Sequence, residues 1–301
     1  MSQITRKLLL AVLTVVVTVV TLGTTTFAWF TLTNTSVIQS FDAQVIGDSG
    51  IELALSSFST DPELLNWRTT LTTAEILAYI ETRFGADFRL DAVTTPDGVN
   101  FYAVGIGAPG ASTTSGYIEL PIHFRSANVS EIKWSQVVLT SGVASWRTPI
   151  AFTDSLNVGR AANSFLNVDA ADAMRISVTG NIASVPTTVA YENPEEATNT
   201  VLGGLTNANL TTAVGANSFY FNSTATYPGG IEDVSTIDTY TALGAGVKVL
   251  DLTSGNALTP GIDLEYYGRI TIRIWFEGWD AEAYNSLLNR VVSTRFTFAK
   301  V

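Results

Sequence analysis

Apolar and polar residues alternate in three separate stretches of the chain, and this pattern limits the fold more than any other feature. Residues 117–125 carry Ile, Leu or Phe at every second position, and residues 269–276 and 292–298 follow a similar pattern. Because successive side chains of a strand point to opposite faces of a sheet, each stretch predicts a strand with one buried face. Pro121 has no backbone N–H, so we expect the first strand to lie at a sheet edge or to bulge there.

Further strands and a few helices complete the predicted fold. Eight more strands are expected, at residues 40–45, 50–55, 100–105, 131–140, 173–179, 187–191, 218–221 and 247–252. Thr72 and Glu75 have the spacing of a capping box, and Gly85 is placed to end the helix that follows. A second short helix is expected over residues 280–289. This content predicts an all-β fold: an antiparallel β-sandwich of jelly-roll type with one or two short helices.

The first 28 residues have the layout of a secretory signal. Arg6 and Lys7 precede the uncharged run 8–22, and small residues lead up to Ala28. The run is shorter than the ~20 residues that a membrane-spanning helix needs. We therefore expect a hydrophobic signal helix that is cleaved between Ala28 and Trp29. A retained membrane anchor is the alternative, because the aromatic residues that follow extend the apolar stretch.

After the signal, we expect an N-terminal strand over residues 29–38 and a single sandwich domain over residues 39–301. Residues 193–246 are rich in Thr, Asn, Gly and Ala and have a weak pattern, which favours an insertion in that domain.

The segment at the predicted new N-terminus is β-prone, uncharged and apolar. Trp29, Phe30, Leu32 and Val37 are its large apolar residues. One interpretation is that it forms the first strand of the chain's own sheet. The other is that it is a self-assembly strand, added to the sheet of a neighbouring copy. An exposed apolar strand promotes aggregation unless something covers it, and both interpretations stay open.

Composition excludes several classes of function. The net charge of −11 argues against nucleic acid as a partner, because phosphate binding needs a basic surface. The chain has no Cys and one His, which removes thiolate chemistry, disulfides and the usual zinc sites. None of the common catalytic or phosphate-binding motifs occurs. We therefore predict that the chain is not an enzyme and has no catalytic residues, with His123 as a solvated surface residue.

One cluster of oxygen-bearing side chains is a weak candidate for calcium, and no other cofactor is expected. Its members are Asp154, Asn157, Asn163, Asn167, Asp169 and Asp172. Calcium prefers such ligands, but their spacing does not match an EF-hand loop. The alternative is that these residues form ordinary turns.

Both ends of the chain resemble one family. Residues 23–31, 34–36 and 49–53 are similar to the N-terminus of the TasA/camelysin group, Gram-positive surface and matrix proteins released by SipW-type signal peptidases. Residues 269–280 are similar to closing segments of SipW-dependent proteins, and residues 117–126 also resemble them. The resemblance implies a jelly-roll subunit of extracellular fibres whose N-terminal segment completes the sheet of the next subunit.

The function expected from these observations is a structural protein of a bacterial surface or biofilm matrix. Its partners would be other copies of itself and a signal peptidase, and the membrane if the signal is retained. The alternative is a membrane-anchored adhesin, in which outward aromatic residues stack on sugars. Its candidate residues are Trp67, Trp146, Tyr266 and Trp279, although packing is the favoured explanation for them. Camelysin-type proteins have been filed as metallopeptidases, but one His cannot build a zinc-protease centre.

Overall fold

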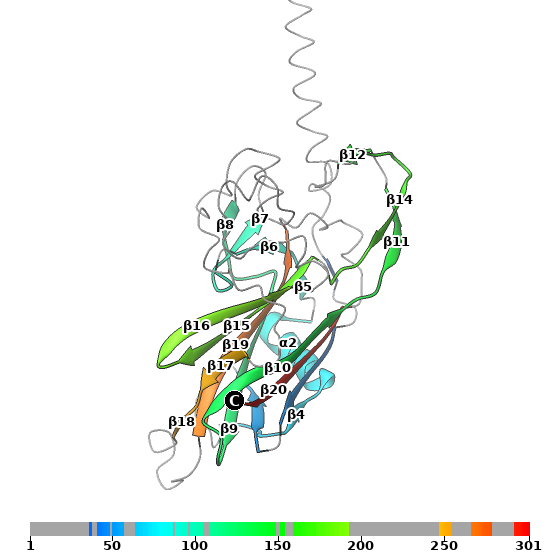
Figure 1. The fold of residues 1–301 in the computed structure, drawn as a ribbon. Coiled ribbons are helices and arrows are strands. Elements are labelled where there is room, and N and C mark those ends of the chain that lie inside the picture. Colours follow the sequence, from blue (N-terminus) through cyan, green and yellow to red (C-terminus); the bar gives the residue numbers. More distant parts are fainter. Residues whose placement is uncertain are drawn as a thin grey trace, which may run out of the picture.

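The computed structural model describes residues 36–37, 41–48, 50–56, 64–86, 88–95, 97–104, 109–148, 151–153, 159–171, 173–192, 247–254, 266–278 and 292–301. In these ranges the chain is mainly β, and its two larger sheets pack on a shared core, as the sequence predicts for a sandwich (Figure 1).

The five-stranded sheet has the order β17-β10-β20-β2-β4. Its strands are β17 (Val247–Asp251), β10 (Glu131–Thr140), β20 (Val292–Lys300), β2 (Phe41–Gly47) and β4 (Thr70–Leu71). Neighbours are antiparallel except β2 and β20, which run parallel. The strand at residues 292–298 is confirmed, and its even-numbered residues are buried.

The nine-stranded sheet centres on β19 (Tyr266–Glu277), which pairs with β15 (Met174–Ile182) on one side and β9 (Ile118–Ser126) on the other. The remaining strands are β3 (Glu52–Leu55), β6 (Ala92–Thr94), β7 (Phe101–Val104), β8 (Pro109–Thr113), β16 (Val185–Glu192) and β18 (Thr253–Ser254). β6 and β19 are parallel. The prediction of an antiparallel sandwich is therefore wrong at two pairings.

Three two-stranded ribbons accompany the sheets. They pair β1 (Ser36–Val37) with β5 (Arg89–Leu90), β11 (Ala144–Arg147) with β14 (Phe165–Val168), and β12 (Phe152–Thr153) with β13 (Gly159–Arg160). The ribbon of β11 and β14 extends away from the sandwich (Figure 1).

Helix α2 (Thr73–Phe84) forms where the capping box predicts it. The backbone N–H of Thr72 donates to the Glu75 carboxylate at 2.9 Å, and the N–H of Glu75 donates to the Thr72 hydroxyl at 3.4 Å. These bonds satisfy donors that a helix start leaves unpaired. Ile76 and Ile80 then bury one face of the helix in the core.

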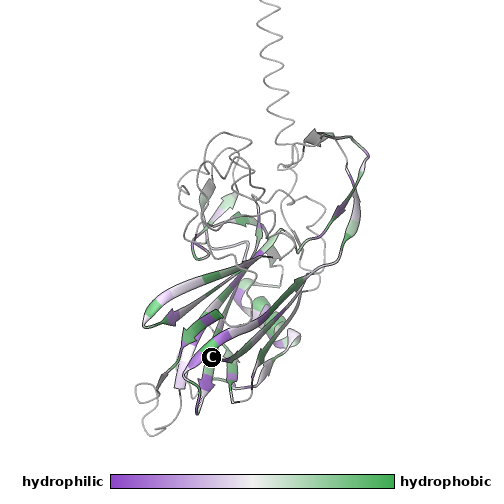
Figure 2. Cartoon of the chain, in the orientation of Figure 1, coloured by the Kyte–Doolittle hydropathy of each residue, from purple (hydrophilic) through white to green (hydrophobic). Residues whose placement is uncertain are grey.

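The core lies between the two sheets. Figure 2 shows apolar residues along the strands of both. Phe124 of β9 meets Phe298 of β20 edge to face, with ring centroids 5.0 Å apart. Trp134 of β10 stacks on the same Phe298 at 6.3 Å. These rings join the sheets, because one ring comes from the nine-stranded sheet and two from the five-stranded sheet.

The strand does not bulge at Pro121, and on its β3 side Pro121 lies on a stretch of edge that has no described strand partner. β9 has β19 on one side and β3 on the other, with no register shift. Pro121 lies one residue past the last β3–β9 pair, Leu55 with Ile122. Its missing N–H therefore leaves the β3–β9 ladder intact.

Some predictions fall outside the described residues: the signal over 1–28, the insertion near 193–246, the strand at 218–221 and the helix at 280–289. Within the described ranges, no helix has both the length and the apolar character to span a bilayer.

Candidate functional site

The predicted cleavage site and most of the predicted self-assembly strand lie outside the described residues. This applies to Ala28, Trp29, Phe30 and Leu32. Val37 is described in β1, where it pairs with Arg89 of β5, and this is a pairing within the chain. The described end of the segment is therefore held by two residue pairs, outside both larger sheets.

Strand β10 has one edge that β17 covers only in part. β17 pairs with β10 between Glu131 and Trp134. From Ser135 to Thr140, no described strand pairs with this edge, while β20 pairs along the other. Val137 packs against the core and Leu139 is buried in it. Such a strand edge presents backbone donors and acceptors to which another strand can bind.

The structure tests little of the calcium prediction. Asp154, Asn157 and Asp172 lie outside the described residues. The Asp169 carboxylate accepts hydrogen bonds from the Ser141 hydroxyl at 2.6 Å and from the Ala171 N–H at 2.9 Å. Asp169 thus organises a turn at the base of the β11–β14 ribbon. The described ranges contain no group of three His, Asp or Glu residues that could hold a metal.

His123 is buried, which corrects the expectation of a surface residue. It is 7% exposed, and its Nε2–H donates to the carbonyl of Ser56 at 3.0 Å. Burial lowers the pKa of His123, the bond to Ser56 opposes this shift, and the nearby charge of Arg269 lowers the pKa further. A neutral His with its donor fixed to the backbone is a structural residue of this strand.

His123 predicts a pH dependence of stability. Its pKa is below the ordinary 6.5 in the folded chain, so the unfolded chain takes up the proton first as the pH falls below 6.5. The free energy of unfolding should therefore decrease as the pH is lowered below about 6.5. Above that pH the contribution of His123 should be constant. Urea unfolding between about pH 5.5 and 7.5 measures this. The chain has one His, so H123Q should remove the dependence. A wild-type slope that persists in H123Q would contradict it.

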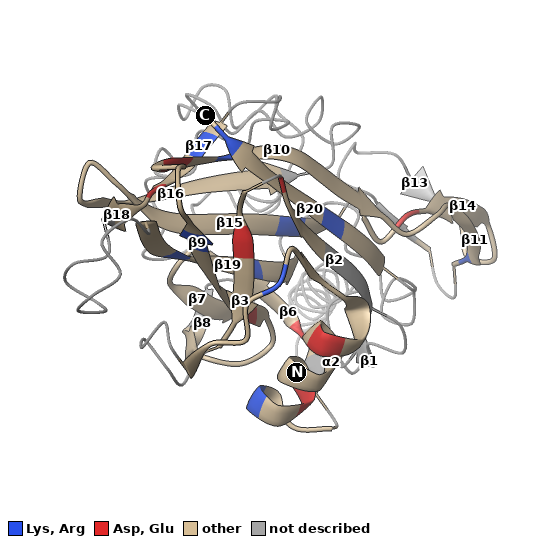
Figure 3. Ribbon diagram, turned by 90° about the horizontal axis from the view of Figure 1, so that it is seen from below, with Lys and Arg blue, Asp and Glu red and all other residues tan. Residues whose placement is uncertain are grey.

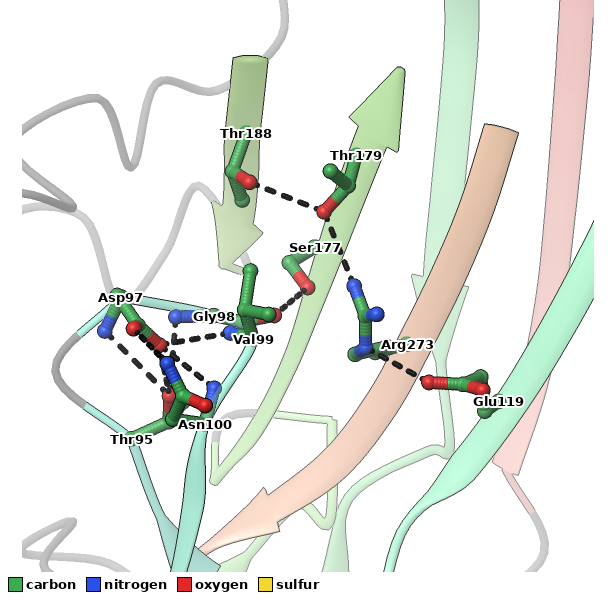
Figure 4. A network of polar contacts seen from close by, with 10 residues as sticks. All are labelled: Thr95, Asp97, Gly98, Val99, Asn100, Glu119, Ser177, Thr179, Thr188 and Arg273. Carbon is green, nitrogen blue, oxygen red and sulfur yellow. Dashed lines mark hydrogen bonds and ion pairs between the residues drawn. The ribbon is translucent and has the colours of Figure 1, made fainter. Parts of the chain in front are cut away.

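A polar ladder crosses the nine-stranded sheet (Figure 4). Arg273 of β19 donates to the Glu119 carboxylate of β9 at 2.9 Å and to the Thr179 hydroxyl of β15 at 3.0 Å. The hydroxyls of Thr179 and Thr188 then meet at 2.9 Å, which extends the ladder to β16. Each charge has a partner, and the ladder joins four strands.

The loop after β6 docks on the same sheet face (Figure 4). The Asp97 carboxylate accepts from the N–H groups of Val99 and Asn100 at 2.8 and 2.7 Å. Burial opposes ionisation of Asp97, but these hydrogen bonds prevail and hold its pKa below the usual value. The Ser177 hydroxyl donates to the carbonyl of Gly98 at 2.6 Å. The sequence Pro96-Asp97-Gly98 is typical of a turn. No feature of the neighbouring sequence predicts that this turn contacts Ser177.

The aromatic residues proposed to bind sugars are partly buried where they are described. The Arg125 guanidinium lies 4.8 Å from the centre of the Trp67 ring, and Arg125 also pairs with Glu52. Trp146 and Tyr266 pack against the core. Trp279 lies outside the described residues. Packing thus accounts for the three that are described.

The described residues contain as many Asp and Glu as Lys and Arg. Figure 3 shows the two signs interspersed over the strands. The net charge of −11 therefore arises from the rest of the chain.

Comparison of the chain with protein-family models, curated proteins and solved structures found no match in any of the three. The resemblance to the TasA/camelysin group therefore stays a prediction from short stretches of the sequence.

Proposed function

We propose that the chain is an exported structural subunit of extracellular fibres or a cell-surface matrix. In this proposal a signal peptidase cleaves after Ala28, and residues 29–37 then add a strand to the next copy. The sandwich would be of jelly-roll type, without catalytic activity. The acidic residues outside the described strands would keep monomers soluble before assembly.

The observation that carries this proposal is the partly covered edge of β10. On the β17 side of β10, the six residues Ser135–Thr140 have no described partner strand. Val137, Val138 and Leu139 make this stretch apolar. At about 3.3 Å per residue this edge is ~20 Å long, and an extended segment of nine residues spans ~30 Å. Residues 29–37 are therefore long enough to pair along it. Backbone hydrogen bonds would supply affinity, and the large apolar side chains would supply specificity.

Deleting residues 29–37 should leave a folded monomer that forms no filaments. Circular dichroism checks folding, and negative-stain electron microscopy compares the deletion with residues 29–301. The deletion removes the added strand and none of the strands of the two larger sheets. Filaments of normal appearance from the deletion would refute the proposal.

Engineered cysteines test the acceptor edge directly, because the chain has no Cys of its own. Paired positions on neighbouring strands bring Cβ atoms to about 4.5–5.5 Å, and the closer, non-hydrogen-bonded pairs approach the ~4 Å of a disulfide. V138C should cross-link with F30C or L32C on a second copy. The matched control is V185C, on the exposed outer strand β16. Cross-linking to V185C in place of V138C would assign the added strand to the other sheet.

The alternative proposal is a membrane-anchored binding module. It requires residues 8–28 to be retained, so the intact mass of the exported protein separates it from the cleaved subunit.

A further inference from the structure

A hollow of about 450 Å³ lies where the end of β10, the beginning of β20 and the beginning of α2 come together. Its lining includes Thr72, Val138, Thr140, Ser293, Thr294 and Arg295. Its volume falls within the range of small-molecule sites, about 300–1,000 Å³. Hydroxyl groups and one guanidinium dominate this lining.

The sheet register groups four of these side chains. Val138 is opposite Arg295, and Thr140 is opposite Ser293. Positions two apart on a strand share a face, so the four side chains project from one side of the five-stranded sheet. Arg295 and Thr140 are exposed, and Ser293 is half-exposed. A ligand in the hollow can therefore meet the guanidinium and two hydroxyls together.

These polar groups have no partner within the described part of the chain. No hydrogen bond or ion pair engages the Arg295 guanidinium or the hydroxyls of Thr140 and Ser293 there. Other arginines are engaged: Arg68 pairs with Glu75, and Arg273 with Glu119. Thr294 also contributes to the lining, but its side chain projects to the buried face of β20, opposite Ser293 and Arg295, where its Oγ1 has no hydrogen-bond partner among the described residues. Unsatisfied buried hydroxyls are uncommon and call for an explanation.

Glu75, in the first turn of α2, already has partners of its own. One Glu75 oxygen lies 2.6 Å from Arg68, and the other accepts the N–H and hydroxyl of Thr72. Both oxygens of the Glu75 carboxylate thus already have partners, Arg68 and Thr72. Arg295 therefore has no ion-pair partner among the described side chains, which do not include that of Asp42, opposite Ser293 on β2.

We propose that this hollow binds a carboxylate-bearing sugar, such as a uronic acid unit of an acidic polysaccharide. The guanidinium fork matches the two oxygens of a carboxylate. The hydroxyls of Thr140 and Ser293 can each donate to and accept from sugar hydroxyls. A sugar ring carries several hydroxyls beside its carboxylate, so one small ligand can pair with both hydroxyls and the guanidinium at once. The hollow shares Val138 and Thr140 with the β10 edge proposed to accept residues 29–37, whereas Arg295 and Ser293 belong to β20, so binding is measured on the unassembled monomer.

Calorimetric titration of the exported protein with sodium glucuronate tests the site, with glucose as the neutral match. Glucuronate should bind at least tenfold more tightly than glucose, because a hydrogen bond to a charged group contributes more than a neutral one. R295Q should weaken glucuronate binding about tenfold or more, and S293A a few-fold. The matched control is R269Q, at an exposed arginine on the nine-stranded sheet, and it should bind like the wild type.

Three outcomes would overturn the proposal: no saturable binding of glucuronate, equal binding of glucose, or an equal loss in R269Q. A polyglutamate peptide that binds through Arg295 more tightly than glucuronate would instead assign the hollow to acidic protein segments. R295Q should still form filaments, so failure of the sugar site is distinguishable from failure of the fibre proposal.

Discussion

Replacing Gly180 with alanine should lower the free energy of unfolding by about 3 kcal/mol, at the upper end for overpacking a core. A Cβ at Gly180 of β15 would collide with the carbonyl oxygen of Val249 in β17. That oxygen is backbone of the opposing sheet, so it cannot rotate away. The two sheets would have to move apart at this contact. Urea unfolding of G180A against the wild type measures the loss.

Gly268→Ala is the matched control in the same sheet. Its Cβ would meet the side-chain ends of Leu252 and Leu250, at 2.7 and 3.0 Å. Leucine methyl groups can shift, so we expect a loss of about 1 kcal/mol. Equal losses in G180A and G268A would contradict the argument that backbone contact sets the cost.

Trp134→Ala should cost about 4 kcal/mol, in the range for emptying a buried aromatic site. Trp134 is fully buried, and its ring contacts Phe296 and Phe298 at centroid distances of 5.8 and 6.3 Å. Its removal leaves a cavity among rings that join the two sheets. Chemical unfolding, with near-ultraviolet circular dichroism to report tertiary packing, measures this loss.

Trp134→Phe should cost far less, about 1 kcal/mol. The indole Nε1–H is buried and has no hydrogen-bond partner in the described part of the chain. Phenylalanine keeps the aromatic contacts and removes this unpaired donor, which partly offsets the lost volume. A W134F loss as large as that of W134A would show that the indole ring itself, and not only an aromatic group, is required.

The strands and the helix could be predicted because their signals are local. Ile118, Leu120, Ile122 and Phe124 are buried as the period-two alternation predicts, although Pro121 and His123 on the other face are buried as well. α2 begins at Thr73 because Thr72 and Glu75 cap it, and both lie within four residues of the helix start. Each of these signals involves only neighbouring residues, so it can be recognised without knowing the rest of the fold.

The wrong predictions concern contacts between distant residues. His123 was expected in solvent because it alternates with apolar neighbours, yet β3 and Ser56 cover it from 67 positions earlier in the chain. The parallel pairing of β2 with β20 brings together opposite ends of the sandwich domain. No short pattern encodes either contact.

The same limit applies to the candidate sites. Thr140, Ser293 and Arg295 are unremarkable in sequence, and only the β10–β20 register groups them beside α2. Trp29, Phe30 and Leu32 stand out in sequence because of their composition, but the edge that would receive them requires the sheet order.

The parallel pair of β2 and β20 has a consequence for biosynthesis. β20 lies between β10 and β2. Neither of these two strands can pair on that side until the nine residues of β20 leave the ribosome. The hairpin of β15 and β16 can form earlier, because its strands follow each other directly. Pairings of high sequence separation fold slowly. The nascent chain therefore stays without a closed sandwich until residues 292–300 are free to pair.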